Sequence, residues 1–176
     1  MQSSYKVGNL GEVIGTFNQD RASGIGGKVG KAPNSIPVFV SVSDVARGQN
    51  NAVRVSIVED EKLVPAILDA AVYNTVTKTL DRKGGGTARL HFEISGRDKD
   101  NKLITIDREN MYYASSGLAN VINFEMVEAA NILSQNKFEA VDIYGITVNA
   151  EITDEVQVAE ITQVSTPKRD VKPGAK

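Results

Sequence analysis

Apolar and polar residues alternate in several short stretches of this chain, as they do in β-strands that bury one face. In residues 36–42 three valines occupy one side, while Phe39 and Ser41 occupy the other. Residues 53–58 repeat the alternation after a turn-like stretch at residues 47–51. These stretches therefore predict an antiparallel hairpin.

Further strands are predicted on both sides of this hairpin. Those before it are residues 5–7 and 12–17. After it, residues 87–95 place apolar and polar side chains on opposite faces, and residues 103–106 return from a charged turn at residues 97–101. The last two predicted strands are residues 141–152 and 156–164.

Two helices interrupt the strands. Asp60 can cap a helix that extends toward Asp81, with Pro65 in the first turn, where its missing N–H costs little. A second helix is predicted for residues 119–135, and Asn136 is a suitable C-terminal stop. Its apolar stripe comprises Val121, Ile122, Met126, Ala129, Ala130 and Leu133.

This order of elements predicts an α+β fold that is predominantly β, with antiparallel strands in a sandwich or partial barrel and two inserted helices. The 176 residues fit one domain of the usual ~100–200 residues. We assign residues 1–166 to a single β-rich domain; the alternative is a small N-terminal lobe, 1–45, packed on residues 46–166. Residues 167–176 are expected to be a linker or the start of a further domain.

Composition excludes several classes of function. The net charge of -2 gives no electrostatic case for binding nucleic acid or an anionic membrane. The absence of cysteine excludes a disulfide framework and thiolate metal sites. No run of residues approaches the ~18 apolar residues of a membrane helix, so we expect no membrane insertion. Residues 1–4 also lack the basic and apolar regions of a signal peptide.

A glycine-dense stretch at residues 24–30 invites comparison with phosphate-binding loops. The spacing fails, because Ile25 stands where a P-loop requires glycine and Ala32 stands where it requires Ser or Thr. A tight turn is the better interpretation of these glycines. The neighbouring Asp20 and Arg21 have two open roles: fixing this turn by hydrogen bonds, or binding the carboxylate or phosphate of a small ligand.

His91 is the single histidine, so any Ser-His-Asp relay or histidine-based metal site would have to include it. It falls on the polar face of a strand, and the sequence has no serine nucleophile elbow, so a solvent-facing structural histidine is predicted. Asp98, Asp100 and Asn101 provide only some of the oxygen ligands of a calcium loop and are expected to form a solvated turn. We therefore predict no catalytic, cofactor-binding or metal-binding residues.

Two segments carry a family resemblance. Residues 8–27 contain the pattern Gly-x-x-Gly-x-x-x-Gly-Thr, then Gln-Asp-Arg, then Gly-Ile-x-Gly, and residues 36–44 read Ile-Pro-Val-x-Val-x-Val-x-Asp. On these motifs the chain resembles the SpoIVB-type serine peptidase family, and more closely the larger bacterial envelope proteins that carry such a domain. Further similarity lies at residues 63–65, 86–88, 136–141 and 171–174.

The departures from that family limit what the resemblance implies. Its active site pairs a histidine in a Gly-His stretch with a serine in a Ser-Gly-Ser-Pro stretch, and neither is present here. His91 lies in another context, and Ser115, Ser116 and Gly117 lack the rest of the serine motif. The resemblance therefore implies a piece of an exported or cell-envelope protein, related to trypsin-like barrel peptidases but without their catalytic dyad.

Three functional hypotheses follow. The first is a non-catalytic structural or interaction segment of such an envelope protein, with a protein partner or the neighbouring domains of a longer chain as its contact. The second is part of a serine endopeptidase whose dyad lies in flanking sequence. The third is a small-ligand binding module that uses Asp20 and Arg21. Flanking sequence distinguishes the first two, because only the enzyme requires both catalytic motifs.

Overall fold

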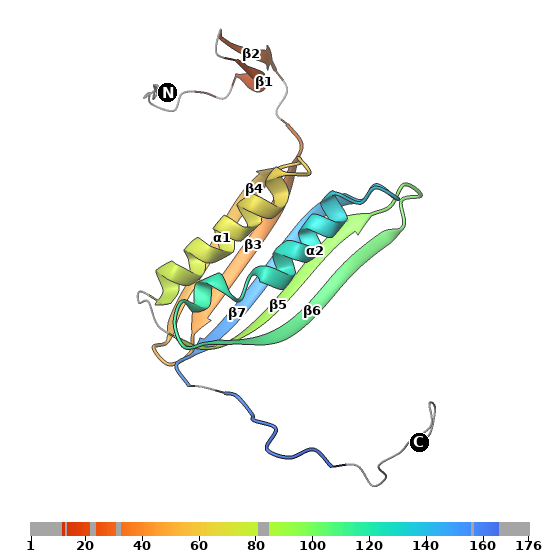
Figure 1. Cartoon of the computed structure of the whole chain (residues 1–176). Helices are drawn as coiled ribbons and strands as arrows, with labels where there is room; N and C mark the ends of the chain where they lie inside the picture. The colour runs from red at the N-terminus through yellow and green to blue at the C-terminus, as the bar shows by residue number, and fades with distance from the viewer. Residues whose placement is uncertain are drawn as a thin grey trace, which may run out of the picture.

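In the computed structural model the chain forms two β-sheets and two main helices (Figure 1). It describes residues 12, 14–21, 24–30, 33–80, 85–155 and 157–165. Strands β1 (Gly15–Arg21) and β2 (Gly24–Val29) pair antiparallel as a two-stranded sheet. The predicted strand at residues 5–7 and the predicted linker at residues 167–176 lie outside the described residues.

Five strands form the main sheet, in the order β4-β3-β7-β5-β6. Their bounds are β3 Ser35–Asp44, β4 Gln49–Val58, β5 Gly86–Arg97, β6 Leu103–Ala114 and β7 Asp142–Thr153. The last strand, β7, lies in the middle, parallel to β3 and antiparallel to β5. The two hairpins predicted from the sequence, β3–β4 and β5–β6, are both present, and they flank β7 on either side.

Each hairpin is followed by a helix, α1 (Leu63–Leu80) after the first and α2 (Phe124–Ser134) after the second. Both helices lie on one face of the sheet (Figure 1). The predicted α+β class, mostly β with two inserted helices, is confirmed. The sheet is mixed and does not close into a barrel, and the helices cover the face that a second sheet would cover in a sandwich.

The core lies between this face and the helices. Alternate residues of the three central strands are fully buried, and Val40, Phe92 and Val148 are exposed by no more than 1%. The two helices and the turn before α2 contribute Leu68, Val72, Val76, Ile122, Met126 and Ala130. Burying each such large apolar side chain contributes roughly 1.5–3 kcal/mol, so this single layer is the main source of stability.

The start of α1 is the one predicted from sequence. The Asp60 carboxylate Oδ1 accepts hydrogen bonds from the backbone N–H groups of Lys62, at 2.9 Å, and of Leu63, at 3.1 Å. Pro65 lies in the first turn, where a backbone donor is not needed. A cap of this kind satisfies N–H groups that the helix itself leaves without an acceptor.

The second helix is shorter than the predicted span of residues 119–135. A 3₁₀ turn at Leu118–Asn120 comes first, and α2 begins only at Phe124. The buried Asn123 donates a side-chain hydrogen bond to Asp69 of α1, which fixes the chain where α2 begins. The predicted stripe is correct for Ile122, Met126 and Ala130, but Val121 is 39% exposed because the break turns it outward.

The predicted strand at residues 156–164 is wrong. Residues 157–165 follow β7 without forming a strand. Both sides of β7 are already paired, with β3 and β5, so a further hairpin strand has no place beside it. Strand β6, in contrast, continues to Ala114, well beyond the predicted end at residue 106.

Candidate functional site

The face of the main sheet that points away from the helices carries most of the chemically versatile side chains. We call it the open face, and it consists of the alternate residues that do not contact the helix layer. On β5 it presents Arg89, His91 and Glu93, as the sequence predicted. Neighbouring strands add Asp107, Glu109, Asn149, Glu151, Ser41 and Phe39 in matching register.

Charged residues of the open face pair across strands. The His91 Nε2 atom lies 2.9 Å from Asp107 Oδ1, and Arg89 Nε lies 3.9 Å from Glu109 Oε1. The side chains of His91 and Asp107 are 37% and 62% exposed, so solvent screens their attraction. Such exposed pairs contribute about 0–1 kcal/mol each, and they mainly define the pattern of charge on the surface.

A histidine beside a carboxylate can serve as a general base when a nucleophile lies on its other side. The nearest serine on the same strand, Ser95, donates its hydroxyl to Glu93 at 2.7 Å rather than to His91. Among the described residues no group of three or more His, Asp or Glu side chains is placed to hold a metal ion. What the described residues place on this exposed face is a histidine–carboxylate pair beside a separate serine–carboxylate pair.

One end of the open face is hollowed. An open pocket of about 640 Å³ lies there between β5, β6 and the end of β7, lined by Arg89, Met111 and Glu151 among others. The Thr87 hydroxyl at its rim donates to the carbonyl of Glu155 at 2.8 Å and accepts the N–H of Gln157 at 2.9 Å. These two bonds hold the chain against β5 where it leaves the sheet.

A second polar cluster joins α2 to strand β6 on the helix side. Glu125 accepts hydrogen bonds from the Tyr112 hydroxyl, at 2.8 Å, and from the Asn110 side-chain amide. Arg108 lies 3.8 Å from the same carboxylate. Burial, together with the bond to Glu125, raises the pKa of Tyr112 to about 12, while the bonds from Asn110 and Tyr112 lower the pKa of Glu125.

The glycine-dense stretch proves to be strand β2 rather than a tight turn. Gly24 and Gly30 have φ of +156° and +93°, a region that favours glycine, and they bound the strand. At Gly15 on β1, an added Cβ would lie 2.2 Å from the Lys28 carbonyl oxygen, so the two backbones require glycine there. The backbones of Asp20 and Arg21 belong to β1, and their side chains, to which the two roles were assigned, lie outside the described part.

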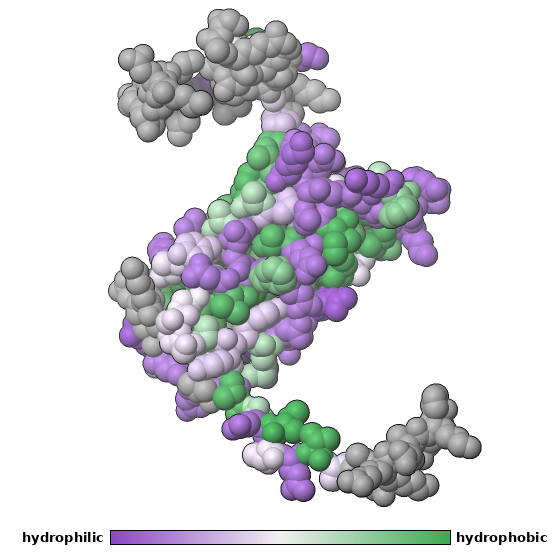
Figure 2. Space-filling model, in the orientation of Figure 1, coloured by the Kyte–Doolittle hydropathy of each residue, from purple (hydrophilic) through white to green (hydrophobic). Residues whose placement is uncertain are grey.

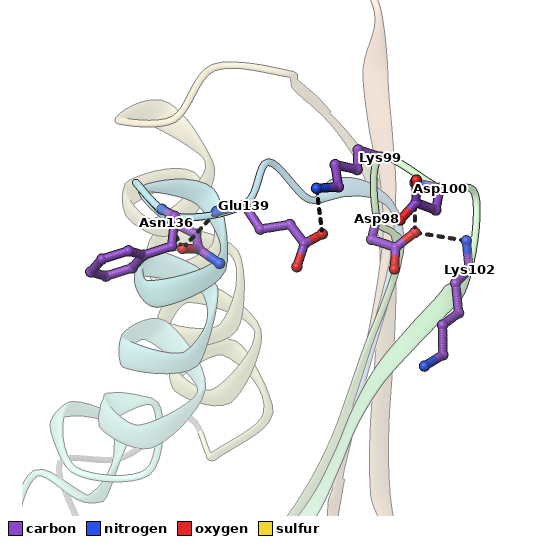
Figure 3. Close-up of polar contacts among 7 residues, drawn as sticks. Asp98, Lys99, Asp100, Lys102, Asn136 and Glu139 are labelled. Atoms are coloured by element: carbon purple, nitrogen blue, oxygen red, sulfur yellow. Dashed lines mark hydrogen bonds and ion pairs between the residues drawn. The ribbon is translucent and has the colours of Figure 1, made fainter.

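The charged turn between β5 and β6 has a structural role, as expected. Asp98 Oδ1 accepts the backbone N–H groups of Asp100, at 2.9 Å, and of Lys102, at 2.8 Å (Figure 3). The neighbouring Lys99 reaches Glu139 at 4.0 Å, which connects the turn to the loop after α2. The carboxylate of Asp98 therefore stabilises the turn that closes the β5–β6 hairpin.

Sequence reasoning placed His91 on the correct face but missed its partner and the Glu125 cluster. The Asp107 partner of His91 and the Glu125 cluster both involve strand β6. The middle residues of this strand, Asp107 to Asn110, are all polar, so they show no alternation of apolar and polar side chains from which a strand could be predicted. Comparisons of the whole chain with protein-family models, with curated proteins and with solved structures returned no significant match. In the described part, no helix is long and apolar enough to span a membrane.

Proposed function

We propose that this chain is a non-catalytic structural or interaction segment of a bacterial envelope protein related to SpoIVB-type peptidases. The observation that supports a recognition role is the pairing on the open face, where His91 contacts Asp107 and the Ser95 hydroxyl contacts Glu93. These polar groups stabilise one another on an exposed sheet. The envelope context rests on the sequence motifs of residues 8–27 and 36–44.

Two physical arguments favour recognition over catalysis. A serine nucleophile needs a base within hydrogen-bond reach, and Ser95 instead bonds a carboxylate on its own strand. A catalytic base also works best in a partly desolvated site, whereas the Asp107 side chain beside His91 is 62% exposed. A face with charges of both signs suits a protein partner or a neighbouring domain, since complementary charges give orientation and specificity.

The first prediction tests this proposal with a fluorophosphonate probe and a casein-like substrate. The chain should show no stoichiometric labelling of any serine and no cleavage, because no serine in the described part is bonded to His91. The measurement is intact mass after labelling, with a known serine peptidase as the positive control. Labelling of any serine that is lost in a His91→Ala variant would contradict the proposed lack of catalysis in this chain.

A further inference from the structure

We propose that residues 157–165 of one copy of this chain add as a sixth strand to the outer edge of β6 in a second copy. This inference rests on the proposed interaction function and names its partner. We call residues 157–165 the donor segment. Within the described part of the chain the donor segment has no strand partner, and the main sheet has two outer edges, β4 and β6, of which β6 is the longer, with twelve residues against ten.

The outer edge of β6 is long and regular. All twelve residues of β6, Leu103–Ala114, pair with β5 in unbroken register, without a bulge. The strand contains no proline or lysine, two common devices for preventing edge-to-edge pairing, and its charged residues are confined to Asp107, Arg108 and Glu109. An open groove of about 440 Å³ follows residues 105–110. Backbone N–H and C=O groups on that side of β6 have no strand partner within the described part of the chain.

The donor segment has the composition of a strand. It contains no proline or glycine, and its β-branched residues Val158, Ile161 and Val164 are 60%, 81% and 83% exposed. Hydrophobic side chains gather along it in the space-filling view (Figure 2). Isolated extended chain that exposes three such side chains gains stability by pairing with a sheet edge.

Within one copy of the chain, the donor segment points away from strand β6. The Thr87 hydroxyl fixes Glu155 and Gln157 over β5, and the residues that follow extend away from the sheet (Figure 1). A second copy presents the same edge without this restraint. Mutual exchange of the two segments around a two-fold axis closes the assembly and satisfies both edges.

Charge sets the register. Glu160 is the single charged residue of the donor segment, and Arg108, which lies 3.8 Å from Glu125 but has a side chain 61% exposed, is the single cation of β6. An antiparallel strand with these two residues opposite each other places Val164 beside Ile104. It also places residues 158–163 along the groove at residues 105–110. Directly opposed ion pairs and apolar pairs are those that stabilise neighbouring strands.

The decisive experiment uses the natural absence of cysteine. Thr105→Cys and Gln163→Cys, both exposed, stand opposite each other in this register. Mixing the two single variants of the full chain under mild oxidation should give a disulfide-linked heterodimer. The matched control pair, Thr105→Cys with Gln157→Cys, lies six residues out of register, about 20 Å, and should not link.

Sedimentation provides the second measurement, over about 1 μM to 1 mM protein. Only one of the two neighbouring residues Ile161 and Thr162 can direct its backbone N–H toward β6, and replacing that residue by proline should raise the dimer dissociation constant at least tenfold. The control Ile161→Val should leave the constant within about twofold. Glu160→Arg and Arg108→Glu should each weaken the dimer, and their combination should restore it.

Three results would overturn the inference. They are a monomer at all concentrations, a dimer that neither proline variant weakens, or a 105–163 disulfide that forms only within one doubly substituted chain. None of these results bears on the proposed lack of catalysis, which the serine probe tests separately. Conversely, serine labelling would reject the proposed function while leaving the strand exchange to these measurements.

Discussion

At the scale of single residues, Glu125 is the point that fastens α2 to the sheet. Its carboxylate accepts hydrogen bonds from Tyr112 and Asn110 of β6 and lies near Arg108 of the same strand. The Glu125 side chain is only 29% exposed, so solvent screens this cluster less than it screens the exposed pairs on the open face. Helix α2 otherwise contacts mainly α1, so the cluster is its principal polar link to the sheet edge.

The second prediction concerns the hydrogen bond that the Tyr112 hydroxyl donates to Glu125. Tyr112→Phe keeps the ring but leaves Glu125 with one hydrogen bond fewer, so the free energy of unfolding should fall by about 1–2 kcal/mol. Urea denaturation measures the change. Tyr113→Phe is the matched control, since Tyr113 is 40% exposed on the opposite face, and it should change stability by less than about 0.5 kcal/mol. Equal effects of the two variants would reject the role assigned to Glu125.

The third prediction follows from the pKa values of the same pair. The pKa of Tyr112 is raised from 10.0 to about 12, so the folded state favours its protonated form. The stabilisation is complete below pH 10 and is lost as the pH rises through 12. The pKa of Glu125 is lowered, so its contribution is present above pH 4.5 and is lost on acidification.

Denaturation of the wild type and Tyr112→Phe across pH measures this linkage. The difference in unfolding free energy between the two proteins should be constant from pH 6 to 9 and shrink from pH 10 to 12. Subtracting the two curves cancels the titration of the other tyrosines and of the lysines. A difference that grows with pH in that window would contradict the raised pKa of Tyr112.

At the scale of elements, the β5–β6 hairpin depends on the turn closed by Asp98. The fourth prediction is that Asp98→Ala lowers the free energy of unfolding by about 1 kcal/mol. The substitution removes the carboxylate that accepts the N–H groups of Asp100 and Lys102, which must then bond to water instead. Asp100→Ala is the control, since that residue contributes a backbone donor to the turn, which the substitution preserves. Urea denaturation should give Asp98→Ala a clearly lower free energy of unfolding than Asp100→Ala. The reverse order would show that the hydrogen bonds to Asp98 do not stabilise the turn.

The sequence predicted those elements whose alternation reflects one buried face. Strands β3, β5 and β7 follow this rule, because the helices cover one side and solvent the other. The rule underestimated β6, an edge strand whose Arg108 and Asn110 meet Glu125 instead of an apolar core. It also assigned residues 156–164 to a strand, because local composition gives no information on whether a sheet has a free place.

The candidate site was less predictable than the fold. That His91 lies on the solvent side follows from periodicity, but its bond to Asp107 depends on the register of two strands joined by a turn. The meeting of Tyr112 and Glu125 depends on where α2 begins, which the contact between Asn123 and Asp69 determines. Both are long-range consequences of packing, which no local pattern encodes.

At the scale of the whole molecule, stability centres on β7. This strand lies between β3 and β5, and its inward side chains Ile146, Val148, Ala150 and Ile152 are no more than 2% exposed. The two hairpins pair with β7 rather than with each other, so they share a sheet only through it. The five-stranded sheet and its two helices should therefore unfold as one cooperative unit.

The fifth prediction compares two neighbouring residues of this strand. Val148→Ala removes buried methyl groups from the centre of the core and should lower the free energy of unfolding by about 2 kcal/mol. Thr147→Ala, on the open face, should lower it by less than about 1 kcal/mol. Both variants should keep the denaturant dependence of the wild type. A second transition, or a changed slope, would show that the hairpins unfold independently.

The central place of β7 also affects how the protein is made. About 100 residues separate the end of β3 from the start of β7, so at about 5–20 residues per second a ribosome needs roughly 5–20 s to supply the strand that covers β3. Until β7 is made, strands β3 and β5 of the nascent chain each have one edge without its native strand partner. Crowded polysomes would bring such edges together, and the yield of native protein should therefore depend on chaperones that keep neighbouring nascent chains apart.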